Sequence, residues 1–188
     1  MRAMRWAERR WPELAGARGT VAILPLGAIE AHGPHLPLGT DVVIAEAMAR
    51  EGARLLAEGG VATHVLPALA YAPAPFAEAF PGTLSIRPQT LVALLLDLAG
   101  ALAVRGVEVL ALANAHFDPA QVGALREAAA RIAAGGRPRV AFPDLTRRAL
   151  AAGLGAEFRS GACHAGRYET SIVLAERPEL VAEAERAG

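Results

Sequence analysis

The sequence has no lysine and a single cysteine, Cys163. Its 19 basic residues are all arginine and balance 19 acidic residues, so the formal net charge is zero. Neither sign of charge forms a run, which argues against a nucleic-acid-binding protein or one that binds an anionic membrane surface. One cysteine excludes an intrachain disulfide and suits a reducing compartment. We therefore expect a cytoplasmic protein whose partners are small molecules or other protein chains.

Long apolar runs are absent as well. The most apolar stretch, LVALLLDLAGALAV, is interrupted by Asp97 and has helical periodicity, and it is shorter than the roughly 20 residues that cross a bilayer. The arginine-rich N-terminus lacks the apolar region of a secretion signal. With 188 residues and no internal repeat, the chain suits a single soluble domain, 1–188, that buries roughly 70% of the surface its unfolded form exposes.

Short apolar runs alternate along the chain with longer, alanine-rich segments. The runs that we expect to form strands are residues 21–26, 61–67, 107–115 and 138–144. The segments that favour helices are residues 41–58, with Thr40 as cap, 88–105, 119–136 and 145–152. This alternation predicts an α/β fold with a mostly parallel sheet covered by helices on both faces. In such sheets, ligands bind beyond the carboxyl ends of the strands.

One connection, residues 66–83, is proline-rich and unusually long. Structureless loops of more than about 12 to 15 residues are uncommon inside compact domains. Two interpretations stay open: the segment walls an active site, or it is a surface loop stiffened by its prolines.

Four of the five histidines lie beside acidic residues in turn-rich segments, namely EAHGPH, NAHFD and CHAGRYETS. The fifth, His64, stands alone in a strand-like run, so we interpret it as structural. Within the first two segments, Glu30 and His32 are two residues apart, as are His116 and Asp118. Residues at this spacing point to the same side of an extended backbone, so each pair can offer two donor atoms to one cavity.

Both pairs follow buried strands, so a parallel sheet would bring them to one edge, where Asp41 at a helix start can join them. Two imidazoles and three carboxylates exceed the three protein ligands of a typical catalytic zinc site. They suit two divalent ions, Zn, Mn or Fe, with Asp41 as the shared carboxylate. Either pair alone is weak evidence, because solvated loops show the same spacing, and the pattern leaves the reaction open.

The segments EAHGPHLPLGTD, FPGTLSI, NAHFD and HAGRYETSIVLAERPELV, in this order, resemble the signature segments of the creatininase (creatinine amidohydrolase) family. The resemblance covers about residues 20–182. It implies a three-layer α/β/α sandwich with a mostly parallel central sheet. It also implies two divalent metal ions, a homo-oligomer such as a hexamer, and hydrolysis of a non-peptide carbon–nitrogen bond in a small-molecule amide, cyclic amide or formamide.

The resemblance also implies roles for individual residues. Glu30 and His116 would bind one ion, His32 would bind the other, and Asp41 would bridge the two.

The last carboxylate ligand has two candidates. Creatininase has an acidic metal ligand two residues after the motif histidine, which here is Asp118, whereas members with glycine there recruit the glutamate of the ETS motif, here Glu169. We assign Asp118 to the metal site and expect Glu169 to act in catalysis together with His164. His164 would protonate the leaving nitrogen or, alternatively, orient a ligand carboxylate.

Neighbouring residues have supporting roles in this interpretation. We expect His35 to shape its loop and Asn114 to orient the His116 loop. Phe117 would either floor the substrate pocket or belong to the core. Arg167 would either pair with an anionic substrate or form a surface ion pair.

Departures from the family pattern argue against creatinine itself as substrate. Ala115 and Arg167 replace the usual glycine and acidic residue, and the only tryptophans, Trp6 and Trp11, lie near the N-terminus rather than where they could close over a flat substrate. The alternatives are a peptidase that trims a cofactor precursor and a non-catalytic metal-binding subunit of an assembly. A cysteine hydrolase is disfavoured, because adjacent Cys163 and His164 would point in opposite directions on extended backbone.

Overall fold

The structure is a computed structural model that describes residues 4–151, 153, 157–158 and 164–185. Within these residues, five strands form one sheet in the order β1-β3-β2-β4-β5, and every neighbouring pair is parallel. The strands are β1 (Met4–Arg5), β2 (Val21–Leu26), β3 (Thr63–Val65), β4 (Val109–Asn114) and β5 (Arg139–Ala141). The predicted parallel sheet is confirmed.

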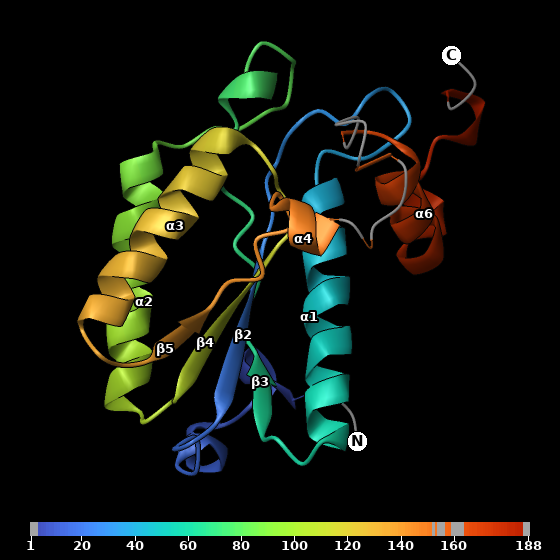
Figure 1. Ribbon diagram of the computed structural model, residues 1–188. Coiled ribbons are helices and arrows are strands. Elements are labelled where there is room, and N and C mark those ends of the chain that lie inside the picture. The colour runs from blue at the N-terminus through green and yellow to red at the C-terminus, as the bar shows by residue number, and fades with distance from the viewer. Residues whose placement is uncertain (1–3, 152, 154–156, 159–163, 186–188) are drawn as a thin grey trace.

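Helices cover both faces of this sheet (Figure 1), which confirms the three-layer architecture. The α-helices are α1 (Thr40–Glu58), α2 (Pro88–Val104), α3 (Pro119–Ala134), α4 (Arg148–Ala151) and α6 (Arg167–Glu176). Short 3₁₀ helices are η1 (Trp6–Glu8), η2 (Trp11–Leu14), η3 (Pro75–Ala77), η4 (Pro178–Leu180) and η5 (Glu183–Glu185). Helix α1 packs on one face with α6 beside it, while α2 and α3 cover the other face. No helix among the described residues combines the length and apolar character needed to cross a membrane.

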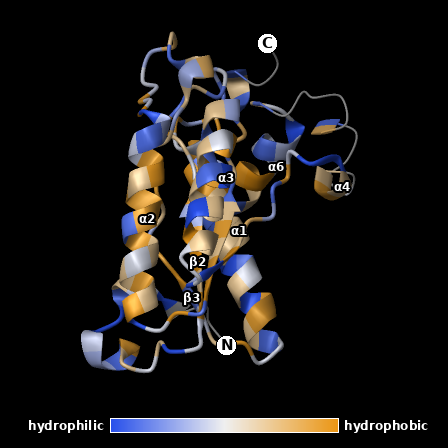
Figure 2. Ribbon diagram, turned by 60° about the vertical axis from the view of Figure 1, so that its left-hand side comes forward, coloured by the Kyte–Doolittle hydropathy of each residue, from blue (hydrophilic) through white to orange (hydrophobic). Residues whose placement is uncertain are grey.

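Alternate side chains of β2 belong to different layers. Leu24 and Leu26 pack in the large core beneath α2 and α3, whereas Ile23 contacts Ala49 and Ala53 of α1. Both faces of the strand are therefore buried, which explains its nearly continuous apolar sequence. Figure 2 shows several strongly hydrophobic turns along α2.

Several element boundaries differ from expectation. Thr40 is the first residue of α1 and not its cap, because its hydroxyl donates to the carbonyl of Pro37. The helix expected over 145–152 is shorter and begins at Arg148, because Asp144 first forms a turn by accepting the backbone N–H of Thr146. Ala152 lies outside the described residues. Strand β1 and helix α6 have no counterpart in the sequence prediction.

The connections diverge next to β2. The chain leaves β2 through α1 to reach β3 on one side, whereas β4 pairs with the other side of β2. Such a switch point opens a crevice at the carboxyl ends of the two central strands.

Candidate metal centre

A close approach of backbones places Asp41 in this crevice. A Cβ added at Gly27, the residue after β2, would lie 2.6 Å from the amide nitrogen of Val42, a distance that real Cβ atoms do not show. Only glycine lets the first turn of α1 come this near to the end of β2. Asp41, in that first turn, thereby faces the residues that follow the strand.

The segment that carries Glu30 and His32 is held by backbone hydrogen bonds on both sides. The amide of Glu30 donates to the carbonyl of Leu38, and the amide of Leu84 donates to the carbonyl of Ile29. The hydroxyl of Thr83 accepts the amide of Ala31 at 3.1 Å. The FPGTLSI segment therefore fixes the Glu30 segment.

Glu30, His32, Asp41, His116 and Glu169 gather at this edge, and all five are buried. Three clusters among the described residues have metal-ligand spacing: Glu30, His32 and the partly exposed His164; Glu30, Asp41 and His116; and His32, Asp41 and Glu169. The two oxygens of Asp41 face different imidazoles: Oδ2 lies 3.0 Å from Nδ1 of His116, and Oδ1 lies 3.2 Å from Nε2 of His32. Asp41 thus belongs to the second and third of these clusters, as a bridging carboxylate would.

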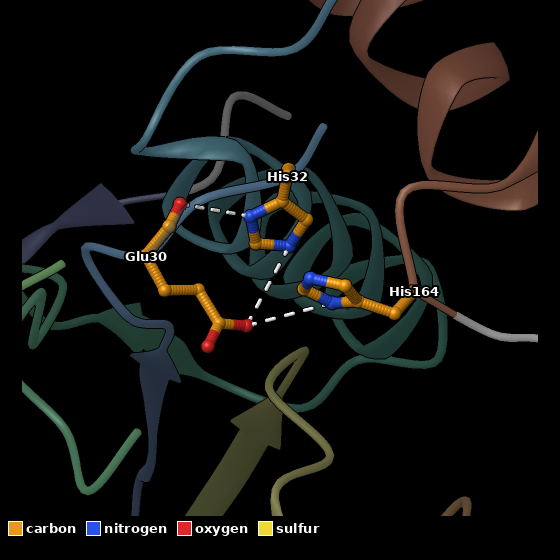
Figure 3. Close-up of side chains that lie close together, drawn as sticks. All are labelled: Glu30, His32 and His164. Atoms are coloured by element: carbon orange, nitrogen blue, oxygen red, sulfur yellow. Dashed lines mark hydrogen bonds and ion pairs between the residues drawn. The ribbon is translucent and has the colours of Figure 1, made fainter. Parts of the chain in front are cut away.

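Backbone carbonyls orient the imidazoles of the site. Nδ1 of His32 donates to the carbonyl of Glu30 at 3.1 Å, and Nε2 of His116 donates to that of Pro73 at 2.9 Å. A carbonyl oxygen only accepts hydrogen bonds, so each of these ring nitrogens carries the proton. The opposite nitrogens face the carboxylates (Figure 3 shows His32), which is the arrangement of metal-binding histidines.

The residues present fit divalent ions on two independent observations. Within the described part of the chain, Nε2 of His32 and Oδ2 of Asp41 are fully buried without a hydrogen-bond partner, a state that costs free energy unless another group satisfies these atoms. The donor set of imidazoles and carboxylates also suits Zn, Mn or Fe.

The pKa values reflect the surplus of carboxylates. Burial opposes the charged ring of His32, but the negative charge of the Asp41 carboxylate, 3.2 Å away, outweighs it and raises the pKa of His32 to about 9. Burial is likewise outweighed at His116, where Asp41 and Glu30 raise the pKa to about 10. Burial raises the pKa of Glu169 to about 7. Without cations, protons therefore neutralise this cluster.

Asp118 lines a small cavity together with Glu30, Asp41 and His116, but its side chain is held differently from theirs. Its Oδ1 accepts the amide of Ala120 at 2.7 Å and so caps α3, and its Oδ2 accepts the amide of Phe76 at 3.2 Å. The clusters of metal-ligand spacing among the described residues do not include it. The structure therefore places Asp118 beside the candidate centre with both oxygens already hydrogen-bonded.

His164 and Glu169 approach the centre from the C-terminal part of the chain. Nε2 of His164 donates to the carbonyl of Ala31 at 2.9 Å, while its Nδ1 lies 3.6 Å from Oε1 of Glu30 (Figure 3). The ring of His164 is partly exposed and lies 4.4 Å from the ring of His32. Glu169 extends from α6 and accepts the amide of Ala165.

A buried amide chain supports the His116 loop. Nδ2 of Asn114 donates to the carbonyl of His116 at 2.6 Å, as expected, and Oδ1 of Asn114 accepts from Nε2 of Gln121 at 3.2 Å. Gln121 is fully buried in the first turn of α3, and sequence reasoning missed it. A signal was available in the sequence. Gln121 lies just after the NAHFD motif, at the start of the predicted helix, where its side chain can reach the residues that follow the strand.

The remaining predicted residues lie in different surroundings. Phe117 lines the cavity. His35 ties its loop to α6 through a 3.0 Å hydrogen bond between Nε2 and the hydroxyl of Thr170. Arg167 is exposed and lines another depression, together with His35 and Thr170. Cys163 lies outside the described residues.

The tryptophans and His64 lie away from the centre. Trp6 packs edge-on against His64, which pairs in register with Ala22 near the amino end of β2. Trp11 is exposed in η2. The carboxyl edge that carries the candidate centre is the opposite edge of the sheet.

Comparison with known families matches residues 7–188 to Creatininase, described as creatinine amidohydrolase. The chain belongs to the creatininase family. It is 37% identical over 172 residues to the mycofactocin precursor peptide peptidase of Mycobacterium tuberculosis, covering 88% of this chain and 62% of the relative. It is 34% identical over 175 residues to the Mycobacterium ulcerans peptidase of the same name, covering 91% of this chain and 61% of the relative. The chain thus spans about six-tenths of the length of these peptidases.

Matches to creatininases themselves extend to solved structures. Creatinine amidohydrolase of Pseudomonas putida is 30% identical over 119 residues, covering 59% of this chain and 44% of that protein. A crystal structure of creatinine amidohydrolase has a TM-score of 0.76 and 29% identity, covering 99% of this chain and 76% of the other. A structure described as creatininase Mn has a TM-score of 0.75 and 28% identity, covering 97% and 76%. The creatininase-like fold is therefore shown.

Proposed function

We propose that this creatininase-family chain is a hydrolase that uses two divalent ions to cleave a carbon–nitrogen bond of a peptide. The observation that carries the proposal is the pair of buried clusters that share Asp41. Relatives described as peptidases, matched over most of this chain, favour a peptide over creatinine. They support the peptidase alternative better than the non-peptide amide that the sequence alone favoured.

The ligand set follows from the clusters. Glu30, Asp41 and His116 would hold one ion, and His32, Asp41 and Glu169 would hold the other. The likeness to a creatininase described as Mn and to a mutant creatininase of the Zn-Zn type supports these metals. Bound there, the ions would polarise the substrate carbonyl and acidify a water molecule.

His164 is proposed as the proton donor. Its Nε2 is held by the carbonyl of Ala31, and its Nδ1 points toward Glu30 at the cavity, so a protonated ring presents one N–H to bound substrate. Hydrolysis adds the hydroxyl of water to the carbonyl carbon and breaks the bond to nitrogen. The leaving nitrogen must then gain a proton, which Nδ1 of His164 is placed to give.

The positions of the two tryptophans also favour a substrate other than creatinine. Trp6 and Trp11 lie away from the carboxyl edge and do not belong to the described lining of the cavity. Arg167 does not belong to the described lining of the cavity, so it gives no support for an anionic substrate. The predicted homo-oligomer stays a proposal from family resemblance, which light scattering tests.

Metal analysis combined with a peptide screen tests the proposal. We expect about two Zn, Mn or Fe ions per chain and cleavage of peptides from a panel that includes mycofactocin precursor segments, read by mass spectrometry. Chelation should abolish cleavage, and alkylation of Cys163 should not. Turnover of creatinine without peptide cleavage would favour the non-peptide interpretation, and two bound ions without any hydrolysis would favour a non-catalytic subunit.

A further inference from the structure

Phe76 is a large apolar side chain left 78% exposed at the cavity that contains the candidate centre. It lies in η3, within the long proline-rich connection, and lines the cavity together with Glu30, His116 and His164. A single exposed apolar residue is ordinary on a protein surface. One that borders a cavity containing reactive groups is in a position to contact a ligand.

The position of Phe76 is fixed by hydrogen bonds to the site itself. Its amide donates to Oδ2 of Asp118, and the carbonyl of the nearby Pro73 accepts Nε2 of His116. The amide of Ala74 donates to the hydroxyl of Ser85. The exposed ring is therefore carried by a backbone segment that is anchored by hydrogen bonds to Asp118, His116 and Ser85, so little backbone ordering remains to be done when a ligand binds.

The other phenylalanine that lines the cavity, Phe117, differs from Phe76, because its ring already packs against another aromatic ring. Phe117 packs edge-on against Phe158 at a centroid distance of 5.7 Å, and Phe158 packs in the same way against Tyr168 at 4.8 Å. Phe76 makes one described ring contact, with the edge of His164 at 6.4 Å. Its ring thus keeps most of its surface available for an incoming apolar group.

The size of the cavity indicates what reaches Phe76. Its volume is about 160 Å³, small beside the roughly 300 to 1,000 Å³ of pockets that enclose whole small ligands. A cavity of this size would hold only the groups around a scissile bond, and neighbouring side chains of the substrate would lie outside it. Phe76 lines the cavity and is largely exposed, so it is within reach of such a side chain.

We propose that Phe76 is a specificity-determining residue that binds an apolar side chain on the substrate residue that supplies the leaving nitrogen. The inference rests on the proposed peptide hydrolysis and on His164 as proton donor. Because the ring of Phe76 meets that of His164, it lies on the side of the cavity to which the leaving nitrogen is directed. Apolar and aromatic groups gain most from such a contact, because a paired ring adds to the area removed from water.

The test uses the full metal-loaded chain and two peptides. Their common sequence is taken from a peptide that the unmodified protein cleaves or binds in the peptide screen. The peptides differ only in the residue that supplies the leaving nitrogen, which is phenylalanine in one and serine in the other. Phe76→Ala should lower kcat/KM on the phenylalanine peptide about 3- to 10-fold, mainly through KM, and leave the serine peptide and the metal content unchanged. Phe76→Tyr should restore the preference.

Phe80→Ala is the matched control. Phe80 is an exposed phenylalanine of the same connection that the described lining of the cavity does not include, so this variant should match the unmodified protein on both peptides. Equal losses on both peptides in Phe76→Ala, or an unchanged preference, would overturn the inference while the hydrolase proposal stands.

Binding separates the inference from the proposed function. Fluorescence anisotropy with the same two labelled peptides needs no turnover. If no peptide is cleaved but Phe76→Ala removes a binding preference for the phenylalanine peptide, the apolar subsite is supported and the hydrolase proposal fails. If there is neither cleavage nor preference, both fail.

Discussion

Two buried aspartates near the carboxyl edge of the sheet have opposite electrostatic surroundings. Asp144 follows β5 and is 3% exposed, while Asp41 begins the crossover helix after β2 and is 1% exposed. The guanidinium of Arg126 donates two hydrogen bonds to Asp144, at 2.9 and 2.6 Å, and Thr146 donates as well. The charge of Asp144 is therefore balanced by the chain itself.

Asp41 has only titratable partners. Its ion-pair partners among the described residues are His32 and His116, and two more carboxylates, Glu30 and Glu169, belong to the same clusters. A permanent cation fixes a turn, as at Asp144, whereas imidazoles can release their protons and coordinate an ion instead. Burial alone therefore does not identify a metal ligand. The distinguishing feature is whether the positive groups that balance the buried carboxylate can release their protons.

The sharpest way to break this comparison is to neutralise each aspartate in turn. Asp41→Asn should remove both ions, measured by mass spectrometry of bound metal. Removing a residue that only hydrogen-bonds a metal ligand typically lowers metal affinity or activity about 10- to 100-fold. Removing the bridging ligand itself should therefore lower hydrolysis by more than about 100-fold. Asp144→Asn should keep both ions and lower only the melting temperature. Two ions retained in Asp41→Asn would contradict a bridging role.

Gly27→Ala tests how the fold holds Asp41 in place. The new Cβ would meet the backbone of Val42 at 2.6 Å, so the start of α1 must shift. We expect a loss of about 1 to 3 kcal/mol of stability and weaker metal binding, measured by denaturation and metal titration. Gly123→Ala is the control: it lies in α3 with nothing within 4 Å, so alanine should stabilise the helix by about 0.5 to 1 kcal/mol. If Gly27→Ala and Gly123→Ala changed stability and metal binding equally, the close approach of Gly27 to the start of α1 would not be what positions Asp41.

A third aspartate sharpens the comparison further. Among the described residues, Asp118 has no ion pair with an arginine or a histidine, and it accepts the backbone amides of Ala120 and Phe76. Glu169→Gln should therefore lower the stoichiometry from two ions toward one, while Asp118→Asn should keep two. Metal content measured on both variants decides between the ligands. The reverse result would restore Asp118 as the ligand that the sequence favoured.

The sequence predicted what depends on local pattern. Glu30, His32 and His116 follow strands whose apolar runs are unmistakable, so their meeting at the carboxyl edge follows from a parallel sheet. Glu169 was indicated only by the family resemblance and Gln121 was missed, because their contributions depend on how α6 and α3 pack, and packing between distant segments leaves no periodic signal. Strand β1 spans two residues and is defined only by its pairing with β3, so no propensity could indicate it.

The smallest expected effect concerns the protons that stand in for metal at Asp41. In the metal-free chain the pKa values of His32 and His116 are raised to about 9 and about 10, above the ordinary value of 6.5. Their charged forms therefore contribute stability that is fully present below pH 6.5 and is lost as the pH rises through 9 to 10. At pH 7.5 both rings are therefore in the charged form with two N–H groups, and an incoming ion must displace one proton from each ring.

Metal binding at pH 7.5 should accordingly release about two protons per chain, measured by titrating metal into buffers of different ionisation enthalpy. The melting temperature of the metal-free chain should fall between pH 7 and 10, while metal affinity rises over the same range. Asp144→Asn should leave proton release unchanged, because Arg126 does not titrate in this range. Metal binding without proton release would mean that His32 and His116 are already neutral, and the contrast between the two aspartates would then lie in hydrogen bonding rather than charge.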